Sequence, residues 1–86
     1  MSLEAMQSSD NRVRWQCRRG TRELDHLLLS WFESSYANAS DTQKSAFRSL
    51  LQLQDPELVA YLLGAASPAD TQLADVVNAV RNRSSG

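Results

Sequence analysis

The chain has 86 residues, of which 42% are apolar and 22% are charged, and its formal net charge is −1. That length and composition are typical of one small globular domain, with little room for a buried active-site cavity beside the core. A single cysteine excludes an internal disulfide and a zinc site built from thiolates, and no apolar run approaches the ~20 residues that span a bilayer. We therefore expect a cytoplasmic domain over residues 10–83 that does not insert in a membrane. Disordered ends are expected at 1–9 and 84–86, and the sequence does not decide whether residues 1–5 are native.

The first two predicted helices flank a glycine. Ser9 or Asp10 can cap a helix that runs to about residue 19. Gly20 then suits the left-handed position that ends a helix, because it lacks the Cβ that penalises positive φ. A second helix is predicted from about residue 21 to 36, since apolar residues recur there at helical spacing: Leu24, Leu27, Leu28, Trp31 and Phe32.

The third and fourth helices are predicted from their capping residues. Ser40 and Gln43 form a capping-box pattern ahead of a helix that ends at about residue 53. Asp55 followed by Pro56 predicts a cap and then a proline at the first helical position, where its missing N–H costs nothing. The short fourth helix carries the apolar residues Leu58, Val59, Leu62 and Leu63.

Gly64 ends the fourth helix, and Ser67 with Pro68 predicts the same cap-and-proline start for a fifth helix that runs to about residue 83. No segment shows the alternation of a β-strand. The sequence therefore predicts an all-α fold, a compact bundle of five short helices.

The charges are unevenly distributed around the first helix. Residues 10–25 hold five arginines and three acids, whereas residues 26–75 hold two basic and six acidic residues. A basic end on an acidic body favours an oriented approach to a partner. Trp15 lies four residues before Arg19, so its ring and the guanidinium are expected to be adjacent. From the pattern alone, an ordinary salt bridge between Arg19 and Glu23 explains these residues as well as a binding site does.

The residues of this junction resemble a known family. Arg19-Gly20-Thr21-Arg22-Glu23 is similar to the RGxxE signature of the SdhE-type succinate dehydrogenase assembly factors, and the extended form W-x-C-R-R-G-x-x-E-L-D is present over residues 15–25. Asp55-Pro56-Glu57-Leu58 and Ser67-Pro68-Ala69-Asp70 resemble two later segments of that family. The resemblance covers about residues 11–83, nearly the whole expected domain.

The resemblance implies a five-helix bundle that binds the flavoprotein subunit of succinate dehydrogenase, and sometimes of fumarate reductase. Such a factor promotes covalent attachment of FAD to a histidine of that subunit; it is not an enzyme, keeps no cofactor and is a monomer when free. By the same resemblance Arg19, Gly20 and Glu23 lie at the contact, and Arg18 and Asp25 flank it. As a physical hypothesis, Glu23 orients Arg19 for charge-assisted hydrogen bonds to the client. The expected partner-binding residues are Trp15, Arg18, Arg19, Gly20, Glu23 and Asp25.

Three other functions compete with this one. A regulatory or antitoxin-like protein-binding module remains open. Nucleic-acid binding through the arginines of the first helix is disfavoured by the acidic remainder of the chain. An enzyme is disfavoured because no metal-ligand set, phosphate loop or nucleophile–base pair is visible, with Cys17 expected in the core and His26 on a polar helix face.

Overall fold

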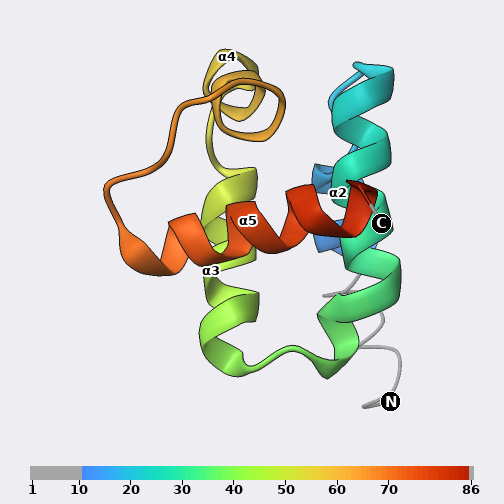
Figure 1. Ribbon diagram of the computed structural model, residues 1–86. Helices are drawn as coiled ribbons and strands as arrows, with labels where there is room; N and C mark the ends of the chain where they lie inside the picture. The colour runs from blue at the N-terminus through green and yellow to red at the C-terminus, as the bar shows by residue number, and fades with distance from the viewer. Residues whose placement is uncertain (1–10, 86) are drawn as a thin grey trace.

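The computed structural model describes the backbone of residues 11–85 and the side chains of residues 11–82. Within this range the regular elements are all helical (Figure 1). They are a first helix over residues 11–16, then α2 Arg22–Ser35, the 3₁₀ turn η1 Tyr36–Asn38, α3 Asp41–Leu51, α4 Asp55–Leu58, the π-helical turn η2 Val59–Leu63 and α5 Thr71–Ser85. The predicted all-α bundle is confirmed.

The helices share one apolar core. In Figure 1, α5 runs across α2 and α3. The first helix contacts α2 through an ion pair between Arg14 and Glu33. Each helix contributes apolar side chains to this core, although Val59 and Leu63 of the predicted fourth helix are exposed. A fully buried aliphatic or aromatic side chain stabilises the fold by about 1.5–3 kcal/mol. The buried hydrophobic residues of this core are Val13, Cys17, Leu24, Leu27, Leu28, Trp31, Tyr36, Ala46, Phe47, Leu50, Leu51, Leu58, Leu62, Val76, Val77 and Val80.

Of the three predicted caps that fall within the described residues, one is formed and two are not. The capping box of α3 is formed, since the Gln43 amide donates to Ser40 Oγ and the Ser40 amide donates to Gln43 Oε1, both at 3.1 Å. The predicted cap at Asp55 is wrong, because Gln54 occupies that position and Asp55 is already helical. The predicted start of the fifth helix at Ser67 and Pro68 is also wrong.

The fifth helix begins instead at Thr71 because Asp70 caps it. Asp70 Oδ1 accepts hydrogen bonds from the amides of Gln72 and Leu73 at 2.8 and 3.2 Å, which satisfies two donors that have no partner within the helix. At the other end α5 continues to Ser85, past the expected domain end at residue 83. The expected cap at residue 9 or 10 and the expected disorder of residues 1–9 lie outside the described part of the chain.

The π turn η2 directs some of its own apolar side chains outward instead of into the core. The Gly64 amide donates to the Val59 carbonyl at 2.8 Å, which closes a five-residue π turn. A Cβ on Gly64 would lie 2.8 Å from the Ala60 carbonyl oxygen, so any larger residue at this position would force the backbone of the turn to shift. Leu62 is buried, whereas Val59 and Leu63 are exposed by 41% and 42%. The exposed Leu63 lies beside the start of α2, where it lines a pocket together with Leu27.

None of the helices within residues 11–85 combines the length and apolar character that crossing a bilayer requires.

Candidate functional site

The chain reverses direction at residues 18–21, which we call the bend. Gly20 has a φ of +83°, the left-handed region that favours glycine. The Arg19 amide just before it donates to Asp25 Oδ1 at 2.6 Å, so a side chain of α2 holds the bend from within the fold. A Cβ on Gly20 would have no atom within 4 Å, apart from its chain neighbours. The outer side of the bend is therefore open to another molecule.

Arg19 faces the protein rather than the solvent. Its Nη2 donates to the carbonyls of Leu51 and Leu53, both at 2.7 Å, and its Nε lies 3.4 Å from Asp55 Oδ1. Only 17% of the side chain is exposed, and the Nε makes no hydrogen bond. The last carbonyls of a helix have no partner within it and carry partial negative charge, which a guanidinium compensates. Arg19 thus connects the bend to the end of α3 by hydrogen bonds and to α4 by its contact with Asp55.

These contacts correct two expectations about Arg19. Its predicted pairing with Glu23 is not formed, and the residue stacked on Trp15 is Arg18, whose guanidinium carbon lies 5.6 Å from the ring centroid. The reason is that the helix ends at residue 16, before Arg19, so helical spacing no longer places its side chain. The closing turn instead has short-range bonds from the amides of Cys17 and Arg18 to carbonyls three residues back.

Trp15 and the arginines beside it form an exposed surface on the first helix. Trp15 is 70% exposed. With Asn11, Arg14 and Arg18 it lines a shallow hollow of about 360 Å³. Arg14 is held against α2 by an ion pair to Glu33 at 2.8 Å, whereas Arg18 contacts the indole. Exposed tryptophan and arginine are the residue types that most often dominate protein–protein binding energies.

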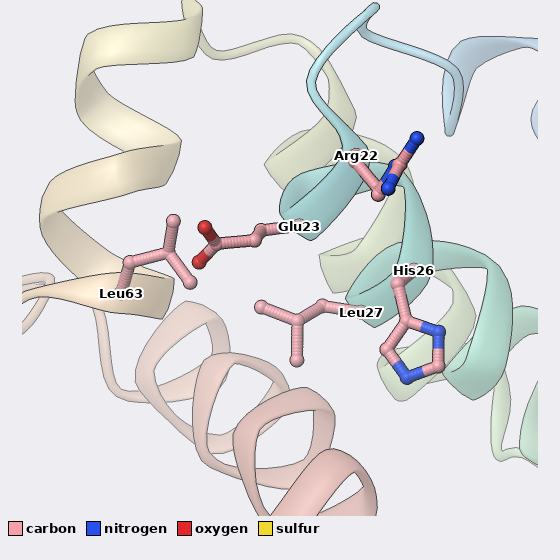
Figure 2. A pocket seen from close by; sticks show the side chains of 5 residues that line it. All are labelled: Arg22, Glu23, His26, Leu27 and Leu63. Atoms are coloured by element: carbon pink, nitrogen blue, oxygen red, sulfur yellow. The ribbon is translucent and has the colours of Figure 1, made fainter.

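Glu23 lies on the other side of the bend, in a groove between the start of α2 and η2. We call this the α2–η2 groove; it has a volume of about 350 Å³ and is lined by Arg22, Glu23, His26, Leu27 and Leu63. Figure 2 shows the Glu23 carboxylate pointing across the groove toward Leu63, while Arg22 and His26 turn to the outer side of α2. Sequence reasoning identified Glu23 but missed Leu63, because the π turn that exposes it has no signal in helical spacing.

The two potentially reactive side chains do not form a catalytic pair. Cys17 is fully buried, and its thiol donates to the Val13 carbonyl at 3.4 Å. Burial raises the pKa of Cys17 from 9.0 to about 12, against a smaller opposing influence of Arg19. His26 is exposed and lies at the α2–η2 groove. Among the residues with described side chains there is no group of three metal-ligating residues.

The sequence matches proteins of one family over nearly its whole length. Residues 11–84 fit the family described as the flavinator of succinate dehydrogenase. A protein of Shewanella oneidensis named FAD assembly factor SdhE is 44% identical over 72 residues, which is 84% of this chain and 88% of that protein. Proteins with the same name from Yersinia pseudotuberculosis and Pectobacterium atrosepticum are 40% identical over 72 residues and 38% identical over 73 residues. These two matches cover 84% and 85% of this chain and 82% and 83% of the relatives.

Proposed function

This chain belongs to the flavinators of succinate dehydrogenase, a family of assembly factors rather than enzymes, and we propose that it binds the flavoprotein subunit of that dehydrogenase. It promotes covalent attachment of FAD to a histidine of the subunit and keeps no cofactor itself. The flavoprotein of fumarate reductase is a second client of the same kind. The factor acts as a cytoplasmic monomer.

The open bend is the observation that carries this proposal. Gly20 combines positive φ with free space over its backbone, so a client can approach the main chain more closely than any side chain would allow. Exposed side chains lie on both sides of it, with Trp15 and Arg18 on one and Glu23 on the other. Arg19 and Asp25 hold the bend in place through the contacts described above.

A rigid contact of this kind can promote a reaction without supplying reacting groups. Attachment of FAD requires the client histidine to stay next to the flavin in one orientation. Holding two reactants in a productive geometry lowers the barrier by removing translational and rotational freedom. The factor acts by stabilising that arrangement of the client. We expect no group of this chain to take part in bond formation, which agrees with the buried, protonated state of Cys17.

The test is co-expression of the chain with the flavoprotein subunit in a host that lacks its own factor. Covalent flavin is measured as fluorescence of the denatured subunit in a gel. We expect strong fluorescence with the native chain and a large loss with Gly20→Val, which fills the space above the bend. Asp75→Ala, on an exposed position of α5, is the control and should behave as the native chain. Full flavin attachment with a folded Gly20→Val variant would contradict the proposal.

A further inference from the structure

The α2–η2 groove is lined by both apolar side chains and a carboxylate. Leu27 and Leu63 form apolar walls, and Leu63 is 42% exposed. The Glu23 carboxylate lies across the opening between them (Figure 2). A groove that is apolar along its sides and negative at one point matches a long side chain with an apolar stem and a cationic head.

Within the part of the chain whose side chains are described, Glu23 has no cationic partner. Among the residues whose side chains are described, neither ion pair involves Glu23: Arg14 pairs with Glu33, and Arg19 lies beside Asp55. Figure 2 shows its neighbours Arg22 and His26 turned away toward the outer side of α2. A carboxylate next to exposed apolar groups gains more from a cation in a bound complex than in free water, because the complex excludes solvent.

We propose that the α2–η2 groove receives a lysine or arginine side chain of the client flavoprotein, with its stem between Leu27 and Leu63 and its head group on Glu23. This inference rests on the proposed function and names the chemistry of the client at this contact. A purely apolar client residue would leave the Glu23 carboxylate desolvated and unpaired, which is costly. An acidic residue would be repelled by it. A basic side chain satisfies both the walls and the charge.

The test measures binding of the purified flavoprotein subunit to this chain by biolayer interferometry at low and high salt. Glu23→Gln keeps the size of the side chain and removes its charge. We expect its Kd to rise by at least about tenfold, the range in which truncation of a buried charge pair falls, and its salt dependence to become shallower. Leu63→Ala should weaken binding while the salt dependence stays that of the native chain. Asp75→Asn makes the same charge change at an exposed position on α5 and should leave the Kd unchanged.

The outcomes separate this inference from the proposed function. If the native chain does not bind the subunit at all, the proposed function fails and the inference fails with it. If the native chain binds and Glu23→Gln binds equally well, the function stands and the basic client residue is refuted. Weaker binding by Glu23→Gln with an unchanged salt dependence also refutes it, because Glu23 then acts as a neutral hydrogen-bond acceptor. Restored binding of Glu23→Lys to a client with one basic residue changed to glutamate supports it and identifies the residue.

Discussion

Replacing Arg19 by alanine tests whether this side chain holds the fold together. The variant loses two hydrogen bonds to carbonyls at 2.7 Å from a side chain that is 17% exposed. Hydrogen bonds to a charged group contribute about 1.5–3 kcal/mol each, and water entering the vacated space recovers part of that loss. We expect the free energy of unfolding to fall by about 2–4 kcal/mol, which lowers the Tm of a domain this size by about 10–30 °C.

Urea denaturation followed by circular dichroism at 222 nm measures the effect. Arg19→Lys keeps the charge but has a shorter side chain and no Nε beside Asp55, so we expect about half the loss of the alanine variant. Arg18→Ala is the matched control, because its exposed cation–π contact with Trp15 contributes only about 0.5–1 kcal/mol. If Arg19→Ala and Arg18→Ala unfold at the same urea concentration, the internal role of Arg19 is refuted.

Three further predictions concern Gly20, Asp70 and Cys17. Gly20→Ala should lower the free energy of unfolding by about 1–2 kcal/mol, because its φ is +83° and not because of a clash; Gly20→Asn should cost less, and equal costs would contradict this. Asp70→Ala should cost about 1 kcal/mol through the lost cap of α5, and a Tm equal to that of the native chain would contradict it. Cys17 should resist a thiol reagent at pH 8 until urea unfolds the chain. Because its pKa rises from 9.0 to about 12, the folded state keeps a proton that the unfolded state releases, so stability relative to Cys17→Ala should decrease as pH rises from 9 to 12.

The helical fold could be predicted because its signals are local. The stripe of α2 and the capping box of α3 depend on residues three or four positions apart, and both are formed. The errors came where two local signals competed. Ser67 with Pro68 is a typical signal for the start of a helix. Asp70, however, lies closer to the apolar residues of α5, and its carboxylate accepts the hydrogen bonds of the first turn. Pro68 lies before the helix and is buried.

The candidate site could be predicted only in part. The bend could be predicted from Gly20 alone, because a positive φ favours glycine and depends on no distant contact. The direction of the Arg19 side chain could not be predicted, because the carbonyls that accept its hydrogen bonds belong to Leu51 and Leu53, which are distant in the sequence. Leu63 was missed for a related reason, because its exposure depends on a π turn closed by Gly64.

The contact between Arg19 and Asp55 makes one unit of two sequence segments that are far apart in the chain. The arginine of the RGxxE segment cannot change freely while the acid of the Asp55-Pro56-Glu57-Leu58 segment stays as it is. We expect the two positions to covary among relatives, and a graft of the RGxxE segment onto another helical scaffold to fail unless the receiving carbonyls and the acid are transplanted together.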